Sequence, residues 1–176
     1  MNVDLRHNPS FAAARIGLEP NEQVRAESGA MMASSYGVSI QAGTQGGVLQ
    51  RAQALGARRG EPLGGFLVRA TGHGTILLAC YGALDTIVLA AGESVTIDTG
   101  HVVAFGETVS SQIRKVAGGV IQTIKSGEGL VFDFTGPGWV MTQTRNPAAL
   151  EAWIRRLMPG ETGGSGGAVL GGILGR

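Results

Sequence analysis

The sequence predicts an all-β protein made of a duplicated unit, followed by one short helix. Three observations support this fold class: dispersed glycines, a segment that recurs later in the chain, and a helical pattern after residue 145. The 30 glycines stand between short apolar runs, as expected for many strands joined by tight turns, because glycine reaches positive φ without a steric clash. We therefore expect a duplicated β-sandwich, or short double-stranded β-helix-like repeats, with a C-terminal helix.

The duplication rests on a match between segments that lie 71 positions apart, "ESGAMMA" from residue 27 and "DTGHVVA" from residue 98. The matched positions are Leu18, Glu22, Val24, Glu27, Ser28, Gly29, Met31, Met32, Ala33 and Val38, which fall on Leu89, Glu93, Val95, Asp98, Thr99, Gly100, Val102, Val103, Ala104 and Val109. We expect one copy at about residues 11–78 and another at about 82–145. A β unit that cannot bury its apolar face alone packs on a neighbour, so homo-oligomers are expected.

The repeated motif is interpreted as structural. Its members are Glu27, Ser28 and Gly29 in the first copy, Asp98, Thr99 and Gly100 in the second, and Gly136 and Gly138 in the later turn "TGPG". Short polar side chains and glycine are typical of turns, where a carboxylate can accept hydrogen bonds from backbone N–H groups.

A helix is predicted at about residues 147–158. Asn146 supplies the N-cap and Pro147 the first helical residue, a favoured start of a helix. Leu150, Trp153, Ile154 and Leu157 share one face, so the helix is expected to dock by this stripe, with Trp153 as the first anchor to test if it is exposed. Residues 1–160 are expected to form one domain, and residues 161–176 a flexible glycine-rich tail.

Charge and cysteine content limit the classes of partner and compartment. The chain has 14 Lys and Arg against 13 Asp and Glu, so its total charge does not indicate a nucleic-acid or anionic-membrane partner. Cys80 is the single cysteine, which excludes an internal disulfide and fits a reducing cytoplasm. The apolar residues 75–92 are interrupted by Gly82 and Asp85 and predict two buried strands rather than a membrane span. We expect a cytoplasmic chain, with peripheral membrane association as a further option.

Four segments resemble the altered-inheritance-of-mitochondria protein twenty-four family: "AESGAMMASSYGV" (26–38), "GGFLVRATGHGTILLACYGAL" (64–84), "IDTGHVVAFGETV" (97–109) and "SGEGLVFDFTGPGWVMTQTRNPAAL" (126–150). The resemblance implies an all-β fold of repeats similar to the tryptophan RNA-binding attenuation protein, assembled as a homotrimer-like ring. Mitochondrial relatives are associated with inner-membrane organisation and respiratory-complex stability, and bacterial ones have no established activity. Relative to the family pattern, "RRGEPLGGFLVRA" (58–70) joins two motifs directly, so the chain lacks about one internal repeat.

An aspartic protease is the sharpest enzymatic hypothesis, because "VTIDTG" contains the hydrophobic-Asp-Thr-Gly signature. Such an enzyme needs two carboxylates that share one proton, so Asp98 would pair with Glu27 or with Asp98 of a second subunit. The terminal "ILGR" (173–176) would be a second element. The duplication fully explains Asp98 as a turn residue whose side chain caps backbone N–H groups, and we therefore expect no enzymatic activity.

A metal site and a nucleophilic cysteine are less favoured. His73, His101 and Glu107 could in principle hold a metal, but both histidines are expected in solvated turns, and neither histidine recurs in the other copy; no metal or cofactor is expected. Cys80 lies in an apolar run and is expected to be buried and inert.

An RNA-binding ring would need repeated basic and aromatic residues. Arg114 and Lys115 align with Ala42 and Gly43, so nucleic acid is not an expected partner. The favoured function is a non-enzymatic homo-oligomeric β scaffold, a trimer by resemblance, that supports membrane or respiratory-complex organisation through an unidentified protein partner or a membrane surface. An RNA- or small-ligand-binding ring is the alternative, and an aspartic-protease-like enzyme that uses Asp98 ranks below it.

Overall fold

The computed structural model describes residues 1–42, 67–116 and 130–157, and within these ranges the all-β prediction with one short helix is confirmed. The strands are β1 (Asn2–Arg6), β2 (Ala13–Leu18), β3 (Gln23–Glu27), β4 (Met31–Ser34), β5 (Val38–Ala42), β6 (Leu67–Gly72), β7 (Gly74–Ala79), β8 (Leu84–Leu89), β9 (Ser94–Asp98), β10 (Val102–Gly106), β11 (Ser110–Lys115), β12 (Leu130–Thr135) and β13 (Gly138–Gln143). Two short 3-10 turns, η1 (Ser28–Ala30) and η3 (Thr99–His101), and the helix α2 (Pro147–Leu157) complete the described elements.

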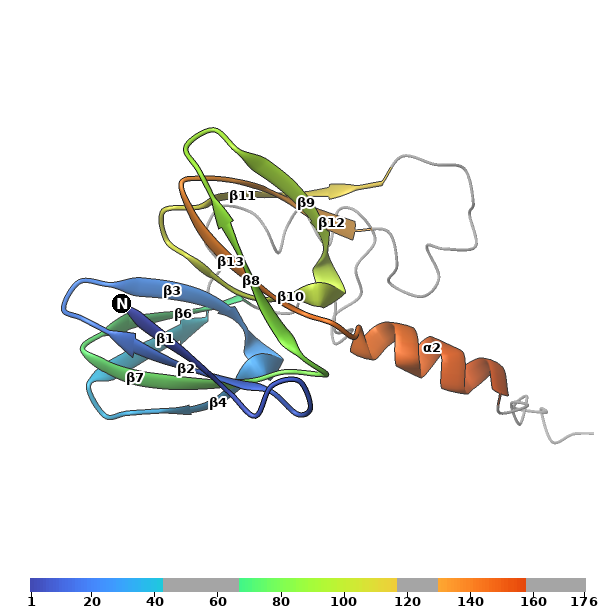
Figure 1. The fold of residues 1–176 in the computed structure, drawn as a ribbon, viewed down its shortest axis with the longest axis horizontal. Coiled ribbons are helices and arrows are strands. Elements are labelled where there is room, and N and C mark those ends of the chain that lie inside the picture. The colour runs from blue at the N-terminus through green and yellow to red at the C-terminus, as the bar shows by residue number, and fades with distance from the viewer. Residues whose placement is uncertain (43–66, 117–129, 158–176) are drawn as a thin grey trace, which may run out of the picture.

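The strands form three antiparallel sheets. Sheet A has the order β1-β2-β7-β4, sheet B the order β5-β6-β3-β10-β13-β8, and sheet C the order β11-β12-β9. In Figure 1, sheet A lies at the lower left, sheet C lies at the upper right, and β10, β13 and β8 of sheet B run between them. Sheet B therefore has another sheet on each of its two faces.

The strand pairing follows the same pattern in the first half (β2 to β7, residues 13–79) and in the second half (β8 to β13, residues 84–143). In the first half β7 pairs with β2 and β4, and β6 pairs with β3 and β5. In the second half β13 pairs with β8 and β10, and β12 pairs with β9 and β11. Each strand of the first half thus has a counterpart in the second, in the same chain order.

The turn that connects the first two strands of each half is also the same. The Glu22 N–H donates to the Glu19 carbonyl at 3.0 Å, and the Glu93 N–H donates to the Ala90 carbonyl at 3.0 Å. The side chain of each glutamate then accepts from the N–H of Glu19 or Ala90, at 2.9 and 2.8 Å respectively. The carboxylate closes the turn by satisfying an N–H group at the strand end.

The two halves join where β3 pairs with β10. Ala104 lies opposite Ala26, Phe105 opposite Arg25, and Gly106 opposite Val24. This pairing fuses one three-stranded sheet from each half into the six strands of sheet B. Every residue of β10 is buried, because the strand has a neighbour on both sides and a sheet on both faces.

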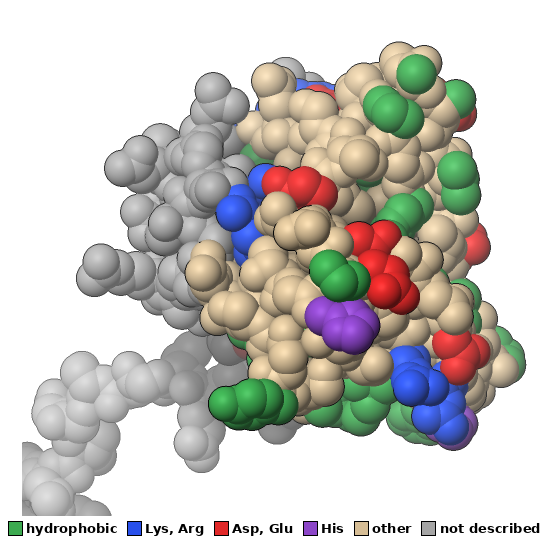
Figure 2. Space-filling model, turned by 90° about the vertical axis from the view of Figure 1, so that its left-hand side faces the viewer, with side chains coloured by type: hydrophobic (Ala, Val, Ile, Leu, Met, Phe, Trp, Pro, Cys, Tyr) green, Lys and Arg blue, Asp and Glu red, His purple; other side chains and the backbone are tan. Residues whose placement is uncertain are grey.

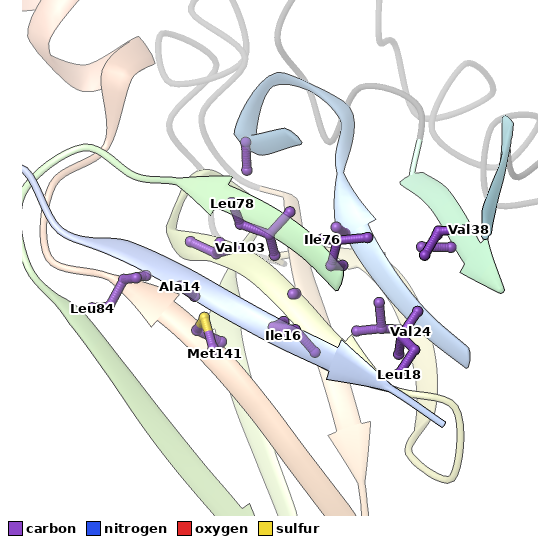
Figure 3. Packing of buried hydrophobic residues seen from close by; sticks show 14 of the residues in the cluster. Ala14, Ile16, Leu18, Val24, Val38, Ile76, Leu78, Leu84, Val103 and Met141 are labelled. Carbon is purple, nitrogen blue, oxygen red and sulfur yellow. The ribbon is translucent and has the colours of Figure 1, made fainter. Parts of the chain in front are cut away.

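Two hydrophobic cores occupy the spaces between the sheets. The first core, between sheets A and B, holds Ala14, Ile16, Val24 and Leu78 of the first half together with Leu84, Val103, Ala104 and Met141 of the second. Figure 3 shows Met141 and Val103 among the residues of β2 and β7. The second core, between sheets B and C, is built around Phe105, Phe132 and Phe134, whose ring centroids lie 5.0–6.4 Å apart. Each core stabilises the fold by removing apolar surface from water.

The apolar residues 75–92 form β7 and β8, joined by a turn at Gly82, as the sequence predicts. Within the described ranges no helix has the length and hydropathy that crossing a bilayer requires. The tail at residues 161–176 and most of the junction segment at 58–70 lie outside the described residues, so those predictions have no structural counterpart here.

Helix α2 begins at Pro147, and the Asn146 side chain accepts a hydrogen bond from the Ala149 N–H at 3.3 Å. Its apolar stripe does not pack on the described strands, so docking by this stripe stays a prediction. The helix extends away from the sheets in Figure 1, and Leu150, Trp153, Ile154 and Leu157 are 36–62% exposed. An amphipathic pattern shows which face is apolar but not what covers it.

Acid should weaken the ion pair between Arg114 of β11 and Asp133 of β12. The guanidinium of Arg114 donates to Asp133 at 3.1 Å and the Thr96 hydroxyl donates to it at 2.6 Å, and these hydrogen bonds lower the pKa of Asp133 in the folded protein. A depressed folded pKa adds stability above the unfolded value, roughly 3.9 for Asp, and the contribution disappears as pH falls through the folded pKa.

We therefore expect wild-type protein to melt at a higher temperature than Asp133→Asn at pH 6, and this difference to shrink as the pH falls below the unfolded value of about 3.9. Circular-dichroism melts between pH 7 and 2 measure it. A difference that stays constant over this range would contradict the stabilising role of the ionised carboxylate.

Candidate functional site at the junction of the two halves

The two copies of the predicted turn motif form the 3-10 turns η1 and η3, each of which carries the chain from one sheet to another. η1 connects β3 of sheet B to β4 of sheet A, and η3 connects β9 of sheet C to β10 of sheet B. Asp98 precedes η3, and its Oδ1 accepts a hydrogen bond from the Gly100 N–H at 2.9 Å and another from the Asn146 side chain at 3.1 Å. Asp98 thus links η3 to the residue before helix α2. Glu27, at the matching position before η1, makes no such capping hydrogen bond.

A cavity of about 390 Å³ opens between the two turns. Its lining residues come from both halves and from the connections beside them: Glu27, Gly29, Ala30, Ala79, Cys80, Tyr81, Thr99, Gly100, Val102, Gln143, Asn146 and Pro147. Glu27 is the one carboxylate in this lining. The two turns with matching sequences therefore meet at one place in the fold, and they differ in how their acidic side chains are used.

Gln143, at the end of β13, connects two segments that line the cavity. Its Nε2 donates to the Gly100 carbonyl at 2.8 Å, and its Oε1 accepts from the Tyr81 N–H at 2.9 Å. Its own carbonyl lies 2.7 Å from Nδ1 of His101. Sequence reasoning did not identify Gln143, because its partners lie 43 and 62 residues away and no local pattern marks it.

Cys80 lines the same cavity and is half-buried, not fully buried as expected. Its Sγ lies 3.2 Å from the carbonyl oxygens of Ala12 and Gly82, and burial raises the pKa of the thiol. A raised pKa lowers the fraction of thiolate, which is the nucleophilic form. The expectation of an unreactive cysteine remains a prediction that this environment favours.

The residues proposed for an aspartic dyad do not share a hydrogen bond. Asp98 is bonded to Gly100 and Asn146, whereas Glu27 lines the cavity without a capping contact. A dyad requires two carboxyl groups close enough to hold one proton between them. The part of the chain that the structure describes contains no hydrogen bond between these two side chains, and "ILGR" lies outside the described residues.

The side chains considered for a metal site lie in separate contacts. His73 is exposed and its Nε2 lies 3.9 Å from Glu19, whereas Glu107 pairs with Arg25 at 3.4 Å. His101 was expected in a solvated turn, and the structure instead places it half-buried in η3 against Gln143. Among the described residues, no group of three or more His, Cys, Asp or Glu side chains is placed to bind one ion.

Gly136 and Gly138 form the turn between β12 and β13. A Cβ on Gly136 would lie 2.3 Å from the Ala90 carbonyl oxygen, and one on Gly138, where φ is +145°, would lie 2.5 Å from Val109. Both distances are far below a van der Waals contact, so glycine is required at each position. These residues are structural neighbours of the β8–β9 turn and do not reach the cavity.

Trp153 is 56% exposed on helix α2. It lies on the same uncovered stripe as Leu150, Ile154 and Leu157, the surface that the sequence singles out for docking.

Comparison with known proteins identifies relatives of uncharacterised function. A family model described as mitochondrial biogenesis AIM24 matches residues 51–145. An uncharacterised protein of Streptococcus pyogenes serotype M6 is 34% identical over 97 residues, which are 54% of this chain and 38% of the relative, so the match spans well under half of that protein. A Streptococcus pyogenes protein solved by X-ray crystallography aligns over 89% of this chain and 99% of its own, with 21% identity and a TM-score of 0.49.

The two turns offer a matched test of the cap at Asp98. Asp98→Ala removes the acceptor for Gly100 and for Asn146, and loss of a capping side chain costs roughly 0.5–2 kcal/mol. Glu27→Ala changes the matching residue, which does not cap. We expect Asp98→Ala to lower the free energy of unfolding in urea by more than Glu27→Ala does; equal effects would show that the cap contributes nothing.

Proposed function

The chain belongs to the mitochondrial biogenesis AIM24 family, and from this membership and its fold we propose that it is a non-enzymatic scaffold that assembles with copies of itself. The resemblance favours a trimer and implies a role in organising membranes or respiratory complexes. The two halves would be copies of one β unit, which share strand order, pairing pattern and turns.

One observation carries this proposal: the way in which the two halves are joined leaves two matching edges unpaired among the described strands. The junction pairs β3 of the first half with β10 of the second. The counterpart of β3 is β9 and the counterpart of β10 is β4, and these strands are the outermost members of sheets C and A. A unit that binds its like through two different edges can bind again through the edges that remain.

The exposed stripe of α2 supports a docking role for the assembled scaffold. The four apolar side chains on an 11-residue helix, including Trp153, are uncovered in the single chain. Contiguous exposed apolar surface of this kind typically marks contact with a protein or a membrane surface. We propose such a partner for α2 and expect Trp153 to be its main anchor.

Two of the described arginines are held in ion pairs, which does not favour RNA as the partner. Arg114 is bonded to Asp133, and Arg25 is paired with Glu107. On the face that Figure 2 shows, lysine and arginine side chains lie beside acidic ones and form no continuous basic patch among the described residues. Phosphate binding depends on accessible positive charge, so the proposal does not include nucleic acid.

Binding of a small ligand is a second candidate function, favoured by the cavity between η1 and η3. Its wall is largely apolar, with Ala30, Ala79 and Val102, and Glu27 brings a carboxylate that does not cap its turn. A cavity of this kind suits an apolar molecule that carries one cationic or hydrogen-bond-donating group. The scaffold could hold such a ligand at the junction of its halves.

The scaffold proposal predicts that the purified chain has a solution mass of two or more times its 18.0 kDa. Light scattering on a sizing column measures this mass at several loading concentrations. A single-chain mass at every concentration in the micromolar range would refute self-assembly.

The ligand proposal predicts that hexylamine shifts the backbone amide resonances of Tyr81 and Gly100, which lie at the cavity, in two-dimensional NMR spectra. Glu27→Gln removes the negative charge and should abolish the shifts, while hexanoate should cause none in the wild type because the carboxylate repels it. Equal shifts with both probes, or with the Gln variant, would argue against recognition by Glu27.

A further inference from the structure

We propose that one chain joins the next by pairing its β4 with the β9 of its neighbour, in the same way as β10 pairs with β3 inside the chain. This inference rests on the proposed self-assembly and specifies its surfaces. Sheet A of one chain and sheet C of the next would become one continuous sheet, as the two halves already do in sheet B.

The internal junction also specifies the register. Inside the chain Ala104, Phe105 and Gly106 lie opposite Ala26, Arg25 and Val24. In the sequence match, each β10 residue corresponds to the residue 71 positions earlier, in or just after β4, and each β3 residue to the residue 71 positions later, in β9. The expected pairs between chains are therefore Ala33 with Ile97, Ser34 with Thr96, and Ser35 with Val95. Ser34 of one chain is therefore expected to lie opposite Thr96 of the next.

The strands β4 and β10 share an irregularity in their backbones. The pairing of β4 with β7 shifts register between Met31 and Ala33, and the pairing of β10 with β13 shifts between Val102 and Ala104. Such a bulge inserts one residue and turns its side chain to a different direction. The bulge residue in β10 is Val103, which points into the core of the first half, and its counterpart in β4 is Met32.

Residues of β10 are more buried than their counterparts in β4, as expected if β4 lacks the neighbouring strand that β10 has. Val103 is 1% exposed, whereas Met32 is 59% exposed. Ala104 and Met141 are fully buried, but their counterparts Ala33 and Leu77 are exposed and half-buried. The first half thus presents on its outer surface the positions that the second half buries.

The strands β2 and β3 are also more buried than their counterparts β8 and β9. Ile16 and Val24 are fully buried, because β10 and β13 close the end of the first core. Their counterparts Ile87 and Val95 are only half-buried and lie at the margin of the second core. The second half therefore has an open core end at the place where the first half is closed by its neighbour.

The edge strands β4 and β9 lack the charged side chains that would prevent them from pairing with another chain. Free edge strands in soluble proteins commonly carry charged residues that prevent association. The sequence of β4, "MMAS", has none, and the one charged residue of β9, Asp98, is bonded to Gly100 and Asn146. Beyond β4, Tyr36 stands at the position of Glu107 and is fully exposed, an apolar ring available to pack beside the β9 strand of the next chain.

The interface is heterologous, since β4 and β9 are different surfaces. Repetition of such a contact closes into a ring if the rotation between chains allows it and otherwise extends as a filament. A second copy of this chain is the occupant that the sequence match and the burial differences support. The contact would remove the exposed Met32 side chain from water.

The first test compares two exposed apolar residues on strands. Met32→Glu places a charge on the β4 edge, whereas Val88→Glu places one on β8, where the side chain is 75% exposed and outside the proposed contact. We expect light scattering to give the assembled mass for wild type and Val88→Glu, and the single-chain mass for Met32→Glu, with unchanged circular dichroism in all three. An assembled Met32→Glu would overturn the β4–β9 contact and leave self-assembly intact, whereas single-chain wild type would refute both.

The second test examines the register by disulfide formation. Chains that carry Ser34→Cys are unfolded, mixed with chains that carry Thr96→Cys, refolded together and oxidised, all in a Cys80→Ser background. Opposite residues of antiparallel strands have the Cα separation that a disulfide needs. We expect a two-chain product in this mixture and none when Thr96→Cys is replaced by Ser110→Cys, which lies on β11. Equal products from both mixtures would contradict the register.

Discussion

The pairing of β3 with β10 is the constraint on which the rest of the structure depends. Only three residue pairs connect the strands, but they place β10 in the middle of a six-stranded sheet with a hydrophobic core on each face. Val103 faces one core and Phe105 faces the other. The same junction brings η1 and η3 to the two sides of one cavity, so both cores and the candidate site share this short contact.

Equivalent strands in the two halves differ in what surrounds them. β10 is buried along its whole length, whereas β4 is mostly exposed, although both have the same bulge and the same neighbour in their own half. The turn carboxylates differ in a similar way, since Asp98 binds two partners and Glu27 does not cap. Local sequence therefore sets the shape of each element, and the contacts between units decide whether it is buried.

Much of the fold could be predicted from the sequence, because its signals are local. Glycines and alternation indicated strands, Gly82 and Asp85 separated β7 from β8, and Asn146 with Pro147 marked the start of α2. The pairing of β3 with β10 could not be predicted, since partners 78 or more residues apart leave no periodic signal. For the same reason Gln143 was missed, and the pattern of α2 shows that one face is apolar without showing which surface covers it.

Hydrogen exchange of the edge strands reports directly on assembly through β4 and β9. Among the described strands, none pairs with β4 or β9 on its outer side, whereas assembly through these edges would protect their amides as β3 and β10 are protected by each other. The account predicts that protection of the β4 and β9 amides rises with protein concentration, while the outer edges β5 and β11 do not change. Fast exchange in β4 and β9 at every concentration would contradict it.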